Sequence, residues 1–511
     1  MTVARRALVS LSDTTGADNL ARALRDHGFV IFATSGTRGF LAARGIEVRD
    51  VERLTGFSPL FGGRVKTLHP NILGAILFDR DSPEQRDEAR RRKIAPIDVV
   101  AVTLYSPPEI DIGGVALLRA AAKNHAHVCV LCHPSQYAEF IAALGGDGPS
   151  LEYRKRLAAA ALQHTGAYDI ANAERVSVSY RARRREGASD VEASASRQTL
   201  ALSLPLRSAL RYGENPQERG AFYAPDGELV PEQLHGKALS YNNLLDLDAT
   251  LRLLSRSGFS QDDASVRAAV VKHTIPCGVA QRATVADAVR EALDADRISA
   301  YGGILATDTM LDGPAAELLA QVFLEIVAAS DFDDAALSAL RKKRNLRVMR
   351  FSRELPQRLA SERSLRSALG GVLVEEPDPT AEPETLRVAS RREPNESEWR
   401  DLRFAWDIVR HVKSNGIVVV NGGVTRGICA GQTNRVSAVE IAACRAGERA
   451  RGAALASDGF FPFVDGLEAA IAAGCSAVIA PRGSIRDEEV IGAADRAGIA
   501  LVFSSHRHFL H

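Results

Sequence analysis

The chain has 511 residues, of which 46% are hydrophobic and 25% are charged, and its formal net charge at pH 7 is +1. A single hydrophobic core rarely organises a chain of this length, so we expect two or three domains. Because the charges are balanced and no tail carries one sign, the composition argues against a nucleic-acid-binding protein.

The N-terminus, MTVARRALVSLSD, lacks the apolar core of a secretory signal, and no uncharged stretch is long enough to span a bilayer. The six cysteines are scattered along the chain, which suits free thiols in a reducing compartment. We therefore expect a cytoplasmic protein that makes no membrane contact.

The first region alternates short apolar runs with amphipathic stretches. RALVSLS, FVIFATSG and IDVVAVTLY read as strands, whereas GADNLARALRDHG and TRGFLAARG read as helices. This alternation predicts an α/β region with a parallel sheet covered by helices. The chemistry of such sheets lies in loops at the carboxyl ends of the strands.

Two of these loops are rich in hydroxyl and glycine residues. The segments Ser10 to Gly16 and Ala33 to Gly39 each follow a predicted strand and precede a predicted helix. Such residues serve as ordinary helix caps, and they also form anion sites at helix N-termini. Arg64, Lys66 and Thr67 follow in the chain and favour a phosphate-bearing ligand. No Walker pattern occurs, so hydrolysis of a nucleoside triphosphate is not indicated.

Cys129, Cys132 and His133 have the C-x-x-C-H spacing of covalent haem attachment. The surrounding HVCVLCHP, however, reads as a buried strand that ends at a proline. We therefore expect two core cysteines here and no haem or zinc.

The composition changes between Ser179 and Gln198, where Arg, Ala, Ser and Glu occur without apolar periodicity. We predict an N-terminal domain over 1–180, a linker over 181–198 and a second region over 199–511. That second region again alternates strands and helices. A looser segment near 365–398 is expected to divide it into two subdomains.

Only nine of the 64 Lys and Arg residues are lysines. Five of them, unlike the rest, lie in turn-rich segments with Gly, His or Asn: Lys66, Lys123, Lys237, Lys272 and Lys413. A lysine can shift its pKa towards neutrality and exchange a proton, which an arginine cannot do. These five positions are therefore candidates for chemistry.

Lys272 and His273 directly follow the apolar run Ala268 to Val271. We predict that a turn from Ile275 to Gly278 presents this pair at the end of a strand. Pro276-Cys277 begins a zinc-deaminase pattern, but Ala280 occupies the place of the second cysteine, which argues against a metal.

Long motifs along the chain then match one family. They include RVKTLHP, DIGGVALLRAAAKNH, LRYGENP, LSYNNLLDLDA, KHTIPCG, AYGGILATD, FAWDIVRHVKSN, AGQTNRV, SDGFFPF and GSIRDEEVI. The chain resembles the bifunctional purine-biosynthesis enzymes that join an AICAR transformylase to an IMP cyclohydrolase. The resemblance implies an N-terminal domain like methylglyoxal synthase, followed by two cytidine-deaminase-like α/β subdomains. It also implies a homodimer whose transformylase site spans the interface.

For the transformylase, the resemblance implies formyl transfer from 10-formyltetrahydrofolate to AICAR, giving FAICAR without a metal. His273 would accept the proton of the amine, Lys272 would supply charge or a proton near N10, and Asn415 would orient the formyl group. The implied nucleotide-site residues are Arg211, Tyr212, Gly302, Glu325, Phe460 and Arg507. The implied folate-site residues are Arg435, Val436, Asp465, Ser484 and Ile485.

For the cyclohydrolase, the resemblance implies ring closure of FAICAR to IMP with loss of water. Lys123 matches the proton-transferring residue, and Lys66, Tyr105 and Asp111 would assist it. The phosphate and ribose would be held by Ser12, Thr34, Ser35, Gly36, Thr37, Arg64 and Thr67.

The chain departs from the family pattern around the cyclohydrolase site. Thr14 and Leu73 replace a lysine and a histidine, and the connection from Tyr105 to Asp111 is short. Gln217 replaces a family histidine in the other half. A competing hypothesis is therefore an enzyme that retains only transformylation, and a non-enzymatic pair of nucleotide-binding modules is a further alternative.

Overall fold

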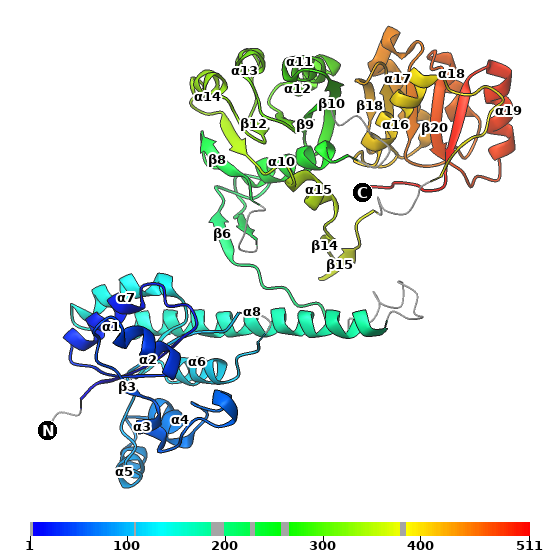
Figure 1. The fold of residues 1–511 in the computed structure, drawn as a ribbon. Coiled ribbons are helices and arrows are strands. Elements are labelled where there is room, and N and C mark those ends of the chain that lie inside the picture. Colours follow the sequence, from blue (N-terminus) through cyan, green and yellow to red (C-terminus); the bar gives the residue numbers. More distant parts are fainter. Residues whose placement is uncertain (1–3, 107–108, 185–198, 225–229, 257–264, 379–384) are drawn as a thin grey trace. The chain divides into compact units, whose positions relative to one another are not determined.

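The computed structural model describes residues 4–106, 109–184, 199–224, 230–256, 265–378 and 385–511. These residues form two compact units, Met1–Ser203 and Leu204–His511, which we describe separately (Figure 1).

The first unit contains a five-stranded sheet in which every pair of neighbours is parallel, in the order β3-β2-β1-β4-β5. Its strands are β1 (Arg6–Leu11), β2 (Val30–Ala33), β3 (Arg49–Asp50), β4 (Val99–Thr103) and β5 (Cys129–Leu131). All residues of β4 and β5 are buried, because helices cover both the inner strand β4 and the edge strand β5. The predicted parallel α/β sheet is confirmed.

Helices surround this sheet. They are α1 (Ala17–Asp26), α2 (Ser35–Ala42), α3 (Glu52–Thr55), η1 (Phe61–Gly63), α4 (Pro70–Leu77), α5 (Pro83–Arg91), α6 (Gly113–Lys123), η2 (Pro134–Gln136), α7 (Tyr137–Leu144) and α8 (Leu151–Arg184). Cys129 and Cys132 are buried in the core of this unit, and desolvation raises the pKa of Cys129 to about 12. These two are core thiols, as predicted.

Helix α8 extends into the segment 181–198 that we predicted as a linker. Backbone hydrogen bonding therefore continues as far as Arg184, and the rest of the predicted linker lies outside the described residues. The contacts divide the chain after Ser203, close to the predicted boundary at 198.

The second unit contains two six-stranded mixed sheets of matching design, shown in green and in orange to red in Figure 1. Their orders are β10-β9-β11-β12-β13-β8 and β18-β17-β19-β20-β21-β16. In each, an antiparallel hairpin is followed by three parallel strands and an antiparallel edge strand. The two halves are therefore structural copies of one α/β arrangement.

The first half comprises β8 (Glu232–His235), α10 (Tyr241–Leu254), β9 (Val266–Lys272), β10 (Ile275–Arg282), α11 (Val285–Ala295), α12 (Arg297–Ala300), β11 (Ile304–Thr307), α13 (Gly313–Ala320), β12 (Ile326–Ala329), α14 (Asp334–Arg341) and β13 (Arg347–Arg350). The second comprises β16 (Leu386–Val388), α16 (Glu396–Val409), β17 (Ile417–Val420), β18 (Thr425–Cys429), α17 (Arg435–Ala446), η3 (Gly447–Ala450), β19 (Ala454–Ser457), α18 (Asp465–Ala472), β20 (Ala477–Pro481), α19 (Asp487–Ala497) and β21 (Ala500–Ser504).

Further elements lie outside the two sheets. The pair β6 (Leu206–Ala209) and β7 (Ala221–Tyr223) precedes the first half. Helix α15 (Leu355–Ala360) and the hairpin β14 (Ser364–Ala368) and β15 (Gly371–Glu375) lie between the halves in sequence. The hairpin falls at the start of the segment 365–398, near which we predicted the subdomain boundary.

A shared core joins the halves. Apolar residues of α10, α16 and one face of each sheet form a single buried cluster. The edge strands also meet, because the Val279 N–H donates to Thr425 Oγ1 over 2.9 Å and the Gln281 N–H donates to the Gly423 carbonyl over 2.9 Å. Arg267 on β9 and Asp407 on α16 form a buried ion pair at 2.8 Å.

The predicted turn from Ile275 to Gly278 is wrong. The chain turns at His273 and Thr274, whose φ angles are 57° and 61°, and Ile275 already begins β10. Pro276 lies at a bulge of this edge strand, where a missing N–H is tolerated. Gly278 serves packing, because a Cβ there would lie 2.1 Å from the Ala292 carbonyl of α11.

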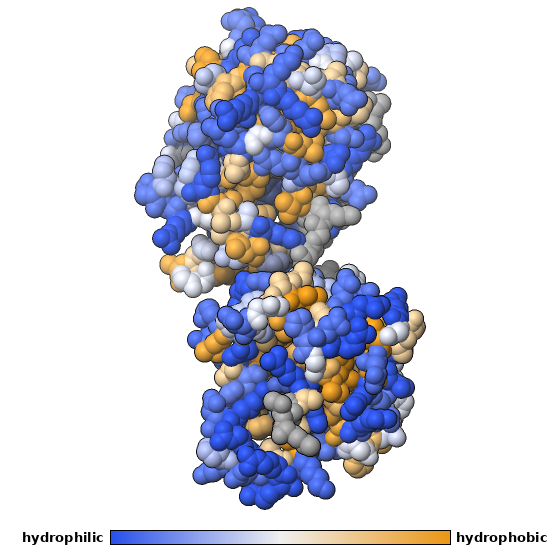
Figure 2. Space-filling model, turned by 90° about the vertical axis from the view of Figure 1, so that its left-hand side faces the viewer, coloured by the Kyte–Doolittle hydropathy of each residue, from blue (hydrophilic) through white to orange (hydrophobic). Residues whose placement is uncertain are grey.

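Hydrophilic residues cover most of the face drawn in Figure 2, with hydrophobic patches between them. Within the described ranges, no helix has both the length and the apolar character needed to cross a bilayer.

Candidate functional sites

In the first unit, Ser12 and Thr103 lie at the carboxyl ends of the neighbouring strands β1 and β4. The chain order reverses between these two strands, which is where ligands bind open α/β sheets. The Ser12 N–H donates to Thr103 Oγ1 over 2.8 Å, and Ser12 Oγ donates to the Leu104 carbonyl over 2.6 Å. Thr37 Oγ1 accepts from the Leu11 N–H at 2.8 Å.

The other predicted phosphate residues belong to the start of helix α2. Thr34 is the residue before the helix, and its hydroxyl lies 3.4 Å from that of Thr37. Ser35 and Gly36 form the exposed first turn. Free N–H groups at this helix N-terminus favour an anion. The structure thus brings Ser12, Thr34 and Thr37 to one edge of the sheet.

Asp111 lies just before α6 and accepts a hydrogen bond from the Gly114 N–H at 2.6 Å. Desolvation raises the pKa of Asp111, while hydrogen bonds from the Gly114 and Tyr105 backbones and the charge of Lys66 act in the opposite direction. A Cβ on Gly113 would lie 2.8 Å from Thr67 Oγ1, so the glycine permits close approach. Lys66, Thr67, Tyr105 and Asp111 therefore form one group.

Two further candidate residues of this unit are exposed. Arg64 is exposed in the segment before Lys66. Lys123 is exposed at the last residue of α6, whereas Asp111 lies before its first turn. The length of the helix separates them by about 15 Å. The structure thus does not bring Lys123 together with Asp111 in one chain.

Sequence reasoning missed Tyr168 of α8. Its hydroxyl accepts from the Asp111 N–H at 2.8 Å and donates to the Glu109 carbonyl at 3.3 Å. The tyrosine therefore holds the segment that carries Asp111. No local pattern indicates this contact, because the partners lie far apart in the sequence.

In the second unit, Lys272 ends strand β9 and its Nζ donates to the Tyr301 carbonyl over 2.8 Å. A Cβ on Gly302 would lie 4.0 Å from this Nζ and 3.6 Å from the Phe323 ring. The Gly302 N–H in turn donates to the Phe323 carbonyl over 2.8 Å. Lys272 and Gly302 are therefore neighbours, and His273 follows as an exposed residue in the turn.

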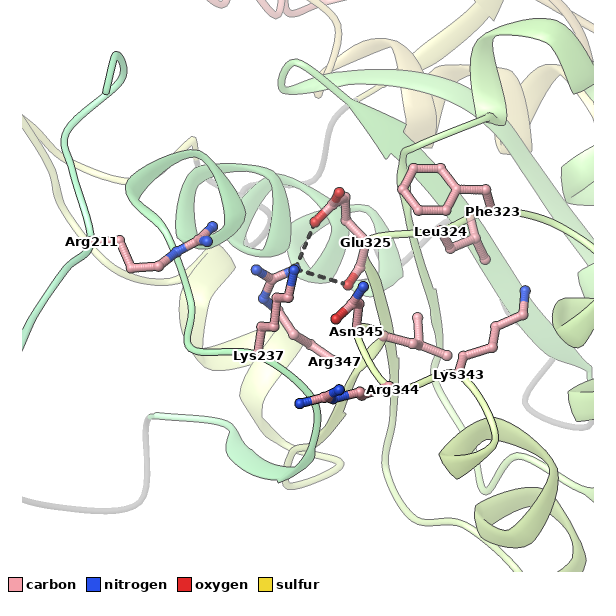
Figure 3. Close-up of a pocket in the computed structure, with 10 residues that line it drawn as sticks. Arg211, Lys237, Phe323, Leu324, Glu325, Lys343, Arg344, Asn345 and Arg347 are labelled. Atoms are coloured by element: carbon pink, nitrogen blue, oxygen red, sulfur yellow. Dashed lines mark hydrogen bonds and ion pairs between the residues drawn. The ribbon is translucent and has the colours of Figure 1, made fainter. Parts of the chain in front are cut away.

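A pocket of about 470 Å³ lies close by, and Phe323 belongs to its wall (Figure 3). Its lining includes Glu325 and five cations: Arg211, Lys237, Lys343, Arg344 and Arg347. In Figure 3 the Arg211, Lys237 and Arg347 side chains converge beside Glu325, whereas Lys343 points away. The excess of positive charge suits an anionic ligand.

Arg347 is a second residue that sequence reasoning missed. It is buried, donates to Glu325 Oε2 over 2.6 Å and also bonds the Ala238 carbonyl. The ion pair fixes the carboxylate of Glu325 at the pocket wall. Arg211 itself stacks on Tyr212, with its guanidinium 5.2 Å from the ring centre.

The remaining candidates lie at one end of the strands of the second sheet. Phe460, Ser484 and Arg507 follow the parallel strands β19, β20 and β21, while Asn415 precedes β17, which runs antiparallel to β19. Asn415 Nδ2 donates to the Gln432 carbonyl over 2.8 Å. In contrast, Gly302 and Glu325 precede strands β11 and β12 of the first sheet. In the first sheet the candidates thus lie at the N-terminal ends of the parallel strands. In the second sheet they lie at the C-terminal ends of the equivalent strands.

The predicted folate residues differ in how far their side chains are exposed to a ligand. Arg435 is buried and paired with Asp458 and Ser457. Val436 follows it at the start of α17, and Asp465 begins α18. The Ser484 N–H donates to Asp487 at 3.1 Å, whereas Ile485 is fully exposed. Of this set, Ile485 offers a free apolar surface and Arg435 supports the local structure.

Comparisons with known proteins find matches along the whole chain. A family model described as AICARFT/IMPCHase bienzyme matches residues 121–445, and an MGS-like domain matches residues 16–129. A Bifunctional purine biosynthesis protein PurH of Synechococcus sp. (strain CC9311) is 45% identical and covers 100% of both chains. Proteins of the same name are 42% identical in Synechococcus elongatus and 40% identical in Bacillus cereus (strain B4264), each over 99% of this chain and 100% of the relative.

The matches cover both units, and the family model extends over more than half of the chain. The α/β fold with an MGS-like N-terminal domain is confirmed. The chain belongs to the AICARFT/IMPCHase bienzyme family of bifunctional purine-biosynthesis proteins.

Proposed function

We propose that the second unit transfers a formyl group from 10-formyltetrahydrofolate to the 5-amino group of AICAR, and that the first unit closes the product, FAICAR, to IMP. Family membership makes the chain a bifunctional enzyme, an AICAR formyltransferase and IMP cyclohydrolase. The carrying observation is the Lys272–His273 pair next to Gly302 and the cationic pocket of Glu325.

In formyl transfer, the weakly nucleophilic amine attacks the formyl carbon and loses a proton, while N10 of the folate gains one. His273 is exposed and accepts the amine proton. Lys272 supplies positive charge or a proton at N10 and at the developing oxyanion, and Asn415 orients the formyl group. General acid–base groups of this kind contribute about 10²- to 10⁴-fold in rate.

Residues from both sheets of the second unit hold the nucleotide. Arg211 and Tyr212, with Gly302 and Glu325, lie on the side of the first sheet. Phe460 and Arg507 lie on the side of the second. Arg435, Val436, Asp465, Ser484 and Ile485 form the folate site, where Ile485 offers exposed apolar surface.

The cyclohydrolase reaction is unimolecular, so folding the substrate into an attack conformation does much of the work. Ser12, Arg64, Thr67 and the start of α2 hold the phosphate and ribose. Lys66, Tyr105 and Asp111 surround the reacting amide. The hydrogen bond between the Tyr105 backbone and Asp111 supports an intact site, because the short connection still brings the two together.

No finding favours the alternative of transformylation alone. One assay separates the possibilities: purified protein is incubated with AICAR and 10-formyltetrahydrofolate, and tetrahydrofolate and IMP are followed separately. Both products should form faster than without enzyme. FAICAR that accumulates without faster closure would leave only the transformylase.

Lys123 is the proton-transferring residue in this proposal, and its distance from Asp111 makes it the assignment to test first. A Lys123→Ala variant should lose cyclohydrolase activity on FAICAR and retain formyl transfer. If closure continues at the normal rate, Lys66 and Asp111 carry the proton transfer without it.

We further propose a homodimer in which two copies complete each transformylase site. The hairpin β14–β15 supports this, because Leu369, Val372 and Leu373 are exposed apolar side chains. The placement of candidate residues at opposite ends of equivalent strands also suits a site shared between chains. Light scattering should give a dimer, and Leu373→Glu should weaken it, whereas Ile298→Glu on exposed α12 should not. An active monomer would contradict the proposal.

The proposed reactions need no metal, and the chain is proposed to work in the cytoplasm. Desolvation raises the pKa of Cys277 to about 12, which disfavours the thiolate that zinc would require. All six cysteines are free thiols, as suits a reducing compartment. Activity should survive dialysis against a chelator, and its loss with recovery on adding zinc would contradict this assignment.

A further inference from the structure

The turn that carries His273 has an unfavourable backbone. His273 and Thr274 both have positive φ, 57° and 61°, in the left-handed region that glycine favours. A β-branched residue such as Thr274 is a pronounced outlier there. Because this backbone is sterically unfavourable for residues with a Cβ, surrounding contacts must hold the turn.

One carboxylate supplies those contacts. Asp246 Oδ2 accepts from the His273 N–H at 3.2 Å, and Asp246 Oδ1 accepts from the Thr274 N–H at 2.7 Å. Asp246 lies near the start of α10, where Ser240 and Asn243 form a reciprocal cap. A capped helix therefore fixes the carboxylate, and the carboxylate fixes both N–H groups of the turn.

The second half of the unit contains the same arrangement. Asp401 of α16 accepts from the Gly422 N–H at 2.8 Å and from the Gly423 N–H at 2.7 Å. These turn residues also have positive φ, 63° and 70°. Here both are glycines, which adopt this backbone without the steric cost. The duplicated fold thus uses one carboxylate clamp twice, and only the first copy places side chains in the turn.

We propose that Asp246 is a positioning residue of the formyl transfer: by clamping the two N–H groups, it holds the His273 side chain where it can take the amine proton. This inference rests on the proposed role of His273. Asp246 touches the turn backbone and acts through it, so its loss should change the orientation of the imidazole more than the binding of AICAR.

The primary test compares Asp246→Ala and Asp246→Asn with Asp248→Asn. Asp248 lies on the same helix, but its carboxylate pairs with Arg252 at 2.8 Å. The Asp246 variants should lower kcat for formyl transfer, on the order of 10²-fold for alanine, because small misplacements of a reacting group are that costly. KM for AICAR should change little, and Asp248→Asn should behave as wild type.

The cyclohydrolase activity of the first unit serves as an internal control in every variant. Ring closure of FAICAR takes place in the first unit and should be unchanged in every variant. Circular dichroism and the thermal transition report whether the second unit is folded. Asp246→Asn keeps one acceptor and the side-chain volume, so it serves where the alanine variant does not fold.

Adding Thr274→Gly to Asp246→Ala separates positioning from a direct charge effect. Glycine adopts positive φ without steric cost, so the double variant should recover part of the lost kcat. If Asp246 acted through its charge on the imidazole, the glycine would not help and the pH profile of kcat would stay shifted. That outcome would overturn the inference, as would normal kcat in both single Asp246 variants.

The proposed function fails in a different way. A His273→Ala variant with full formyl-transfer activity, or a wild-type protein without it, would remove the role of His273 itself. Normal Asp246 variants next to an inactive His273→Ala would leave the function intact and remove only the positioning role.

Discussion

The β9–β10 and β17–β18 hairpins of the second unit share a backbone and differ in their turn residues. Each is clamped by an aspartate of the preceding helix, Asp246 or Asp401, yet one turn is His273-Thr274 and the other is Gly422-Gly423. The glycines adopt positive φ freely, whereas His273 and Thr274 pay a steric cost. The strained hairpin is therefore the one that carries reactive side chains, as expected where strain persists at functional sites.

The largest effect should come from removing the side chain that the second hairpin lacks. His273→Ala should lower kcat for formyl transfer by about 10²- to 10⁴-fold, the range for a lost general base. Gly422→Ala, at the equivalent position, should leave kcat unchanged because open space surrounds it. Steady-state kinetics with 10-formyltetrahydrofolate measures both. Equal effects would remove the distinction between the hairpins.

The next largest effect concerns the ion pair that ties the first hairpin to the other half. Arg267 on β9 and Asp407 on α16 are almost completely buried, at 0% and 2% exposure. Asp407→Ala should lower the free energy of unfolding by about 3–5 kcal/mol, because it leaves a buried charge without its partner.

Denaturant unfolding followed by tryptophan fluorescence measures this change. Both tryptophans, Trp399 and Trp406, lie on α16 and so report on the second unit. Glu448→Ala, which breaks an exposed pair with Arg451, is the control and should change the free energy by less than about 1 kcal/mol. A similar small change for Asp407→Ala would show that the buried pair contributes little.

The two halves differ in the residue that follows their central helix, and we expect this difference to make stability depend on pH at the end of α16. His411 follows α16, whereas Arg256 occupies the matching place after α10 and pairs with Asp308 at 2.6 Å. Desolvation lowers the pKa of His411 to about 3, helped by Arg410, Arg252 and Arg267 and opposed by Asp407.

Between about pH 6.5 and pH 3, His411 is therefore protonated in the unfolded chain and neutral in the folded chain. The contribution of His411 to the free energy of unfolding is fully present above about pH 6.5. It is lost as the pH falls towards 3, by up to about 1.4 kcal/mol per pH unit. His411→Gln should flatten this slope, measured by unfolding at pH 7, 6 and 5. An unchanged slope would assign the acid sensitivity to other groups.

The smallest effect comes from exchanging turn residues. Thr274→Gly should raise the free energy of unfolding by about 0.5–1 kcal/mol, the steric relief less the greater entropy of unfolded glycine. Gly422→Thr should lower it by about 1–2 kcal/mol. Thermal unfolding of both variants checks the pair, and a stabilising Gly422→Thr would contradict the strain argument.

Much of the fold was predictable from the sequence because its signals are local. Short buried strands alternating with amphipathic helices indicated the parallel sheet of the first unit, and the apolar HVCVLCHP indicated core cysteines. Lys272 and His273 stood out because lysines are rare here and this one follows an apolar run. The turn itself was misplaced, because Pro276 and Gly278 are turn-forming residues that serve a bulge and a close helix contact.

The order of residue types along the chain indicates which side chains are available for the chemistry and roughly where each strand ends. Which of these side chains meet depends on how the helices and strands pack. Asp246 reaches the His273 turn, Tyr168 reaches Asp111, and Arg347 reaches Glu325 because separate helices and strands pack together, and no local pattern encodes such contacts. The same packing separates Lys123 from Asp111 by the length of one helix, and it places the two clamped hairpins side by side at a shared sheet edge.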